Sequence, residues 1–181
     1  ASGTSELYNI INKTIEYEKA QQQTDLGWYD RAGLVGDPTT SGLSCAITNQ
    51  YIDQVMEMHG FNDIDLDIDG GGSQLDEFLL DQLNRGIMYY NYRGFYYGAG
   101  SYPPESNQVS NGYYTPFVST ITCGTGDFNG TSSSEQFVKL GSVNDPKGAV
   151  AAVGTSTTGT HTAYNNIVNM GLYEGLFSGS L

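Results

Sequence analysis

The sequence is poor in positive charge. Its 181 residues hold only seven Lys and Arg against 20 Asp and Glu, which gives a formal net charge of −13 at pH 7. Nucleic-acid backbones and anionic membrane surfaces are both bound through clustered cations. We therefore expect neither nucleic acid nor an anionic membrane surface as a partner of this chain.

Long apolar runs and cysteines are also scarce. No apolar run approaches the roughly 20 residues that a membrane-spanning helix needs, so we expect no membrane insertion, and no stretch has the pattern of a signal peptide. Cys45 and Cys123 could pair in principle, but two distant cysteines do not make a disulfide framework, so the redox compartment stays open. The acidic composition, rich in Gly and Tyr and poor in Lys, is common among extracellular proteins, which is a correlation only.

Helical and strand patterns alternate along the chain, and 38% hydrophobic residues suffice for one domain with a core. The spacing of apolar residues predicts helices over 5–19, 44–59, 73–85, 132–140 and 163–176, and strands over 31–35, 63–69, 87–94, 116–122 and 148–154. Such alternation predicts an α/β fold, a three-layer arrangement in which helices flank a parallel sheet with right-handed crossovers.

The apolar residues also predict which sides of the elements face the core. The first helix carries Leu7, Ile10, Ile11, Thr14 and Ile15 at helical spacing, and the second carries Ile47, Tyr51, Val55 and Met58 on one face. In the last helix we expect Tyr164, Ile167, Val168 and Gly171 to face inward. The strand over 148–154 is so apolar that we expect it in the core. Ser73 is expected to cap the helix over 73–85.

Two polar residues follow predicted strands. Cys123 ends the strand over 116–122, and ligands and chemistry collect at the carboxyl ends of parallel strands. A cysteine there is held on a rigid element with its sulfur exposed, as a nucleophile requires, although a buried structural cysteine is the simpler interpretation. Asp37 ends the strand over 31–35, where an Asx turn before Pro38 is the favoured interpretation.

The stretch from Asp63 to Gly72 alternates acidic and aliphatic residues. This pattern predicts a half-buried strand with an acidic outer row. Asp65, Asp67, Asp69 and Asp76 also partly match a calcium-binding loop, although Gly72 departs from it and Asp76 is shorter than the usual Glu. We expect no required cofactor or metal, with structural calcium as the alternative to a solvated acidic edge.

Several motifs together resemble the gingipain family of cysteine peptidases. They are Ile15–Lys19, Tyr92-Arg93-Gly94, Pro116-Phe117-Val118, Cys123–Phe128, Ser134–Phe137 and Lys147–Ser156, in the family's order over most of the chain. The resemblance implies a caspase-like fold and a nucleophile at Cys123. It also implies a bacterial protein exported by type IX secretion, extracellular or at the cell surface. Residues 1–181 would then form one domain of a longer exported protein, with its other domains as partners.

The chain departs from this family at one decisive place. Gingipains carry Gly-His-Gly after the strand equivalent to 87–92, and that histidine is the catalytic base, but the matching residues here are Gly94-Phe95-Tyr96. By resemblance His161 lies near the cysteine in the substrate pocket, where it could accept the thiol proton with Asn165, Asn166 or Thr162 orienting it. The alternative is a surface histidine that caps the last helix.

These observations leave two classes of function. In an extracellular cysteine endopeptidase, Cys123 attacks a peptide carbonyl, backbone N–H groups of Gly94 and Cys123 stabilise the oxyanion, and Asp127 selects a basic side chain. In a non-catalytic binding or structural module, the tyrosines at 96, 97, 102, 113 and 114 form a ligand surface, with Tyr102 also a candidate substrate contact in the peptidase. Cys123 at its strand end favours the first class, and the missing Gly-His-Gly favours the second.

Overall fold

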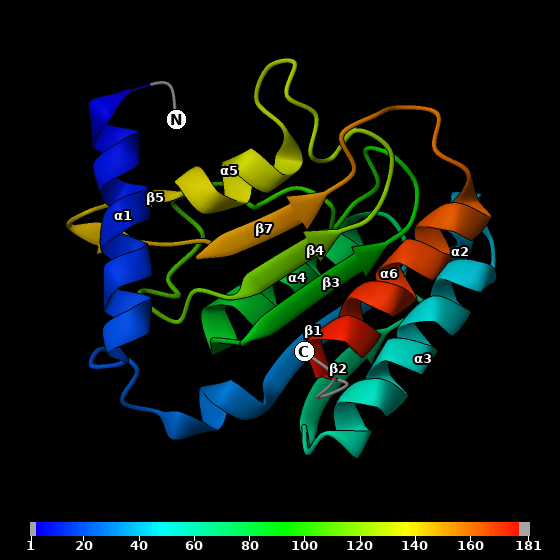
Figure 1. The fold of residues 1–181 in the computed structure, drawn as a ribbon, viewed down its shortest axis with the longest axis horizontal. Coiled ribbons are helices and arrows are strands. Elements are labelled where there is room, and N and C mark those ends of the chain that lie inside the picture. The colour runs from blue at the N-terminus through cyan, green and yellow to red at the C-terminus, as the bar shows by residue number, and fades with distance from the viewer. Residues whose placement is uncertain (1–2, 178–181) are drawn as a thin grey trace.

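A parallel sheet forms the centre of the computed structural model, which describes residues 3–177 (Figure 1). Its helices are α1 (Thr4–Lys19), the 3₁₀ helix η1 (Leu26–Asp30), α2 (Pro38–Ser41), α3 (Ser44–Met58), α4 (Ser73–Arg85), α5 (Ser133–Lys139) and α6 (Thr162–Phe177). Its strands are β1 (Arg31–Gly36), β2 (Asp63–Asp67), β3 (Tyr89–Arg93), β4 (Phe117–Thr120), β5 (Gly141–Ser142), β6 (Asp145–Pro146) and β7 (Ala151–Gly154). Five strands form the sheet in the order β2-β1-β3-β4-β7, and every neighbouring pair is parallel. The predicted α/β class is confirmed.

Helices cover both faces of this sheet, which gives three layers (Figure 1). On one face Ala32 and Leu34 of β1 pack with Ile52 of α3 and Tyr173 of α6. On the other face a separate apolar cluster joins the sheet to α4 and α5; it contains Val35, Leu75, Leu79, Leu83, Tyr90, Tyr92, Val118 and Phe137. Successive residues of each strand therefore face different layers, as the two-residue repeat of a strand requires.

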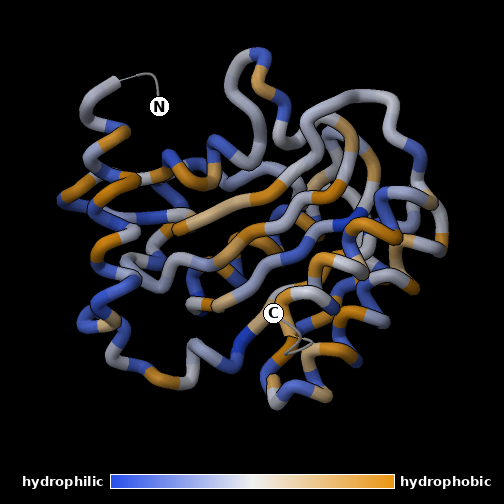
Figure 2. The backbone as a smooth tube through the Cα atoms, in the orientation of Figure 1, coloured by the Kyte–Doolittle hydropathy of each residue, from blue (hydrophilic) through white to orange (hydrophobic). Residues whose placement is uncertain are grey.

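The prediction for the inward faces of the two terminal helices is wrong. In α6, Tyr164, Ile167 and Val168 are 56–71% exposed, whereas Asn165, Asn166, Asn169 and Tyr173 are buried. In α1, Leu7, Ile11 and Ile15 are exposed, and the buried residues are Asn9 and Lys13. Hydrophobic residues recur along both helices in Figure 2, so hydropathy alone does not distinguish their inner sides.

Specific polar partners explain why the polar sides of these helices face inward. The Lys13 ammonium donates to the carbonyl oxygens of Val138 (2.6 Å), Lys147 (2.8 Å) and Leu140 (3.2 Å). Asn9 donates to the carbonyls of Lys139 and Leu140. These carbonyls lie at and beyond the end of α5, where the helix leaves its last C=O groups without intrahelical partners. An apolar α1 face here would leave them unsatisfied.

Three smaller predictions also need correction. In α3, Ile47 and Met58 are 54% and 75% exposed, because the buried side of this helix includes Asn49, which donates to the Val35 carbonyl. Strand β7 lies at the sheet edge with Ala151 and Val153 exposed, so only part of the stretch over 148–154 is in the core: Ala149 is fully buried and Ala152 packs against the core cluster. Helix α4 begins at Ser73, but its N-cap is Gly72 and no side chain caps it.

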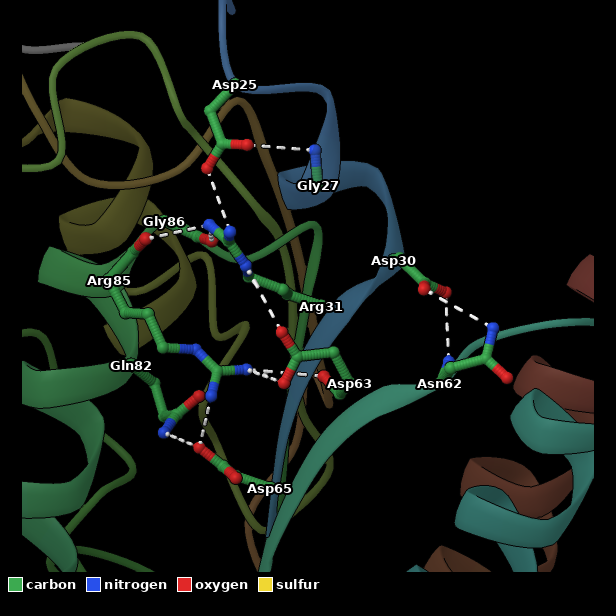
Figure 3. A network of polar contacts seen from close by, with 10 residues as sticks. All are labelled: Asp25, Gly27, Asp30, Arg31, Asn62, Asp63, Asp65, Gln82, Arg85 and Gly86. Atoms are coloured by element: carbon green, nitrogen blue, oxygen red, sulfur yellow. Dashed lines mark hydrogen bonds and ion pairs between the residues drawn. The ribbon is translucent and has the colours of Figure 1, made fainter.

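The acidic row of β2 is held at one edge of the sheet by arginines (Figure 3). Asp63 binds both Arg31 (3.3 Å) and Arg85 (3.0 Å), and Asp65 binds Arg85 (2.7 Å) and Gln82 (2.6 Å). This network ties β1, β2 and α4 together at the amino-terminal side of the strands. It leaves the opposite, carboxyl-terminal side for the candidate site.

Candidate active site

Cys123 lies just beyond the carboxyl end of β4, and its side chain is partly exposed. Backbone hydrogen bonds of the following residue, Gly124, fix the position of Cys123. Gly124 adopts a left-handed conformation (φ 66°), and its N–H donates to the Thr157 carbonyl (2.9 Å) and to Thr155 Oγ1 (3.1 Å). These bonds join the turn after β4 to the segment after β7, so Cys123 faces the segment that leads into α6. Both cysteines of the chain are free thiols.

The Cys123 sulfur contacts Thr160 of that segment. Its Sγ lies 3.1 Å from Thr160 Oγ1 and 3.6 Å from the Thr160 carbonyl oxygen. Asn165 Nδ2 donates to the same Thr160 Oγ1 (2.8 Å), which leaves the threonine hydroxyl hydrogen available to the sulfur. Partial burial raises the pKa of the Cys123 thiol, but the bonds with Thr160 and nearby backbone groups lower it by more, so the net pKa is lowered.

Arg93 ends the neighbouring strand β3, and its side chain is only 1% exposed. The guanidinium donates from Nε to Asn166 Oδ1 (2.6 Å), and from its terminal nitrogens to the carbonyls of Gly94 (2.7 Å) and Thr162 (3.0 Å). Asn166 and Thr162 both belong to the first turns of α6. Arg93 therefore binds the start of α6 to the sheet edge, two residues beyond the Thr160 that contacts the thiol.

His161 follows Thr160 directly and is exposed. Its Nδ1 accepts a hydrogen bond from the Ala163 backbone N–H (3.2 Å), so the imidazole caps the first turn of α6. In this arrangement the ring proton is on Nε2, because the Nδ1 lone pair is engaged. Of the three residues that the sequence suggested as its orienting partners, Asn165 binds Thr160, Asn166 binds Arg93, and Thr162 offers its carbonyl to Arg93.

Gly94 is buried at the end of β3, where the backbone passes close to neighbouring side chains. A Cβ on Gly94 would lie 2.8 Å from the Asp37 Cβ and closer still to the Tyr92 hydroxyl, so only glycine fits without a shift. The Asp37 carboxylate accepts from the backbone N–H of Thr39 (2.9 Å) and from its hydroxyl (2.5 Å), and caps α2. This geometry agrees with the favoured Asx-turn interpretation of Asp37.

A series of tyrosines extends from the turn after Cys123. The ring of Tyr96 lies near Gly124, Tyr96 packs against Tyr97 (3.9 Å between centroids), and Tyr97 stacks on Tyr102 (5.4 Å, 8° between planes). Tyr97 is 67% exposed and adopts φ 56°, a left-handed conformation that is unfavourable for a bulky side chain. Contacts with the rings of Tyr96 and Tyr102 hold it there, so Tyr102 is joined to the neighbourhood of the thiol through two other rings.

Asp127 lines a different depression from Tyr102. It belongs to a groove of about 710 Å³ beside β7, together with Phe128 and Gly154, and its Oδ1 also accepts from the Asn129 N–H (2.9 Å). Tyr102 lines a hollow of about 370 Å³ with Asp76 and Pro104. The two candidate substrate contacts therefore serve separate surfaces.

Three of the four aspartates of the possible calcium loop are bound to protein groups. Asp65 is paired with Arg85, Asp67 accepts from the Gly70 N–H (2.8 Å), and Asp76 accepts from the Gly100 N–H (2.7 Å). Within residues 3–177, no three His, Cys, Asp or Glu side chains gather as a metal site requires. Calcium binding by this stretch stays a prediction.

Comparison with known proteins supplies the family. The sequence profile of peptidase family C25 matches residues 1–180, which is nearly the whole chain. The chain belongs to peptidase family C25. No curated protein matches it. This C25 domain is thus of the cysteine-peptidase type, as the resemblance to gingipains predicted.

Solved structures share the fold of this C25 domain. The Arg-specific cysteine proteinase gingipain R (RgpB) superposes with a TM-score of 0.76 at 21% identity, over 97% of this chain and 43% of that chain. The complex of Porphyromonas gingivalis RgpB pro- and mature domains gives 0.75 at 21% identity, over 96% and 44%. A third structure, described as a protease, gives 0.71 at 22% identity, over 89% and 36%. The C25 domain spans less than half of each of these chains.

Two residues of this C25 site had no strong signal in the sequence. Thr160 is one of several threonines in the segment after β7, and nothing in its spacing marks it as the partner of the thiol. Arg93 ends an apolar strand, and an arginine there is normally exposed. The available sign is the scarcity of cations: the chain has only seven Lys and Arg, and one of them stands in a strand whose two faces both pack against helices.

None of the helices between residues 3 and 177 has the length and hydrophobicity that crossing a bilayer requires.

Proposed function

We propose that this chain is the nucleophile-bearing domain of an extracellular cysteine endopeptidase, with Cys123 as the nucleophile. The observation that supports this most is the environment of the thiol. It is free, partly exposed, fixed at the carboxyl end of a central strand, and bonded to Thr160 in a way that favours its ionised form. A structural cysteine such as Cys45 is fully buried, and burial raises its pKa.

In the proposed reaction the Cys123 thiolate attacks the carbonyl carbon of a peptide. Backbone N–H groups of Gly94 and Cys123 stabilise the oxyanion, and an acyl-enzyme forms when the C–N bond breaks. His161 gives a proton to the leaving amine. To do so the imidazole must first take up the proton that the Cys123 thiol releases, and the bond between its Nδ1 and the Ala163 N–H must open. Water then hydrolyses the thioester.

Substrate recognition is proposed at two separate depressions, one lined by Asp127 and the other by Tyr102. Asp127 would select a basic side chain of the substrate in the groove beside β7. Tyr102, whose ring stacks on Tyr97, would contact the peptide in the other depression. The exposed apolar sides of α1 and α6 support packing against other parts of a longer chain, since this domain spans less than half of the gingipain chain it matches.

The test is peptide cleavage by the purified domain and its variants. A mixed peptide library is incubated with the wild type, Cys123→Ala, His161→Ala and His59→Ala, and products are identified by mass spectrometry. We expect no cleavage by Cys123→Ala and a loss of about 100-fold or more in His161→Ala, because general acid–base groups contribute that much. His59 caps α3 far from the thiol and serves as the matched control.

Cleavage that persists in Cys123→Ala would contradict the proposal. A wild-type domain that cleaves no peptide, while its Cys123 is also unreactive, would support the non-catalytic binding module instead.

A further inference from the structure

Arg93 carries a buried positive charge that no carboxylate neutralises. Its guanidinium is 1% exposed, and its hydrogen-bond acceptors are a side-chain amide and two backbone carbonyls, all uncharged. Within residues 3–177 it takes part in no ion pair, whereas Arg31 and Arg85 each bind two aspartates. A buried unpaired charge is destabilising by several kcal/mol unless something else compensates for it. An anion close to Arg93 would therefore stabilise its buried charge.

Three side chains that can ionise to anions interact with the guanidinium charge, and they differ in how readily they ionise. The charge of Arg93 interacts most with Cys45 of α3, then with Tyr92 of β3, and then with Cys123. Burial raises the pKa of Tyr92 far above its ordinary value and also raises the pKa of Cys45, so neither ionises readily. Asp37 at the end of β1 is buried and donates its backbone N–H to the Arg93 carbonyl (3.0 Å), but its carboxylate accepts from Thr39 and makes no ion pair with the guanidinium within residues 3–177.

The strand geometry brings Arg93 and Cys123 to the same place. In the parallel pair β3–β4, Tyr92 stands opposite Thr120, and the Ile121 N–H donates to the Tyr92 carbonyl (3.1 Å). Neighbouring strands lie about 4.8 Å apart, so the two residues leave adjacent strand ends. Both side chains then bind the same short segment, Cys123 at Thr160 and Arg93 at Thr162 and Asn166.

We propose that Arg93 supplies the positive charge that stabilises the Cys123 thiolate, at the strand end that precedes Phe95. The inference rests on the proposed function, since it names the group that activates the proposed nucleophile. Arg93 touches neither the sulfur nor the substrate, so it is a positioning and charge-supplying residue rather than a catalytic one. Its bonds to Asn166 and Thr162 also hold α6, and with it Thr160, against the thiol.

Other titratable groups near the sulfur have to be separated from Arg93. Tyr96 in the loop after β3 and Asp127 in the loop after β4 interact with one another, and Tyr96 also interacts with Cys123. His161 follows the threonine that the sulfur contacts. A shift that appears in an Arg93 variant and not in a control variant that keeps Arg93 can therefore be assigned to Arg93.

The test is the pH profile of Cys123 alkylation by iodoacetamide, measured in the intact domain from pH 5 to 10. Labelled peptides are identified by mass spectrometry, so that Cys45 is counted separately. Arg93→Met should move the midpoint of the profile up by about one pH unit and slow alkylation at pH 6 about threefold or more, because a nearby opposite charge lowers a pKa by that order. Arg93→Lys should restore part of the shift, and Arg85→Met, at the far end of the sheet, should leave the midpoint unchanged.

A second variant covers the case in which Arg93→Met does not fold. Asn166→Asp has nearly the same shape as the wild type and pairs the guanidinium with a carboxylate, so it should raise the midpoint while Arg93 stays in place. Ala163→Asp adds the same charge to the same turn, away from the guanidinium, and should have the smaller effect. A folded Arg93→Met or Asn166→Asp variant with the wild-type profile would overturn the inference.

The outcome is independent of peptide cleavage. If the midpoint depends on Arg93 and no peptide is cleaved, the charge assignment stands and the proposed function fails. If Cys123 is required for peptide cleavage and the midpoint does not change in the Arg93 variants, the proposed function stands and this inference fails.

Discussion

Replacing Thr160 with valine tests the origin of the reactivity of Cys123. The two side chains have nearly the same shape, so the change removes the hydroxyl that lies 3.1 Å from the sulfur with little repacking. A hydrogen bond to a charged group contributes about 1.5–3 kcal/mol, and one pKa unit corresponds to about 1.4 kcal/mol. The thiol pKa should therefore rise by about one to two units in Thr160→Val.

The alkylation rate of Cys123 should change by less than this change in pKa suggests. The thiolate fraction at pH 6 falls about 10- to 100-fold, but a more basic thiolate is also a better nucleophile, with a Brønsted coefficient of about 0.4–0.5. Alkylation of Cys123 by iodoacetamide at pH 6 should thus slow about 3- to 15-fold, and Thr160→Ser should restore the wild-type rate.

Thr157→Val is the matched control, because Thr157 is exposed in the same segment and its hydroxyl bonds only to the Thr158 carbonyl (3.2 Å). An unchanged profile in a folded Thr160→Val variant would refute the assignment of the lowered pKa to this hydroxyl.

Two further predictions concern buried polar groups of the scaffold. Asn91→Ala removes two buried hydrogen bonds, one donated to Asn49 Oδ1 (2.7 Å) and one accepted from Ser119 Oγ (2.6 Å). Urea unfolding should show that the free energy of unfolding falls by about 2–4 kcal/mol. The control Asn144→Ala, at an exposed turn, should leave it almost unchanged. Burial lowers the pKa of Lys13 to about 7 from 10.5, so the unfolded chain binds more protons between these values and stability rises with pH there. From pH 6.5 to 8.5 the wild type should gain about 2 kcal/mol over Lys13→Met, and parallel pH profiles of the two proteins would contradict this.

The sheet and the place of Cys123 could be predicted because local patterns determine them. Apolar strand segments alternate with helical ones, and this order leaves few topologies for a parallel sheet. Cys123 stands between a strand rich in β-branched residues and a glycine that adopts positive φ, so its position at a strand end follows from neighbouring residues alone.

The inner faces of α1 and α6 could not be predicted in this way. A helical pattern identifies the apolar side but assumes that this side is the buried one. Here Lys13 faces inward because the carbonyls beyond α5 need donors, and Asn166 faces inward because Arg93 needs an acceptor. Both partners are distant in sequence, about 130 and 73 residues away, and no local pattern records them.

The most direct test of the account is the ionisation of Cys123 in the unmodified domain, followed by thiolate absorbance and by the pH profile of its alkylation. The account predicts a midpoint clearly below that of an ordinary cysteine, which is about 8.5, with Cys45 unreactive while the protein is folded. A midpoint at or above the ordinary value, in a protein shown to be folded, would contradict the claim that this strand end carries an activated nucleophile.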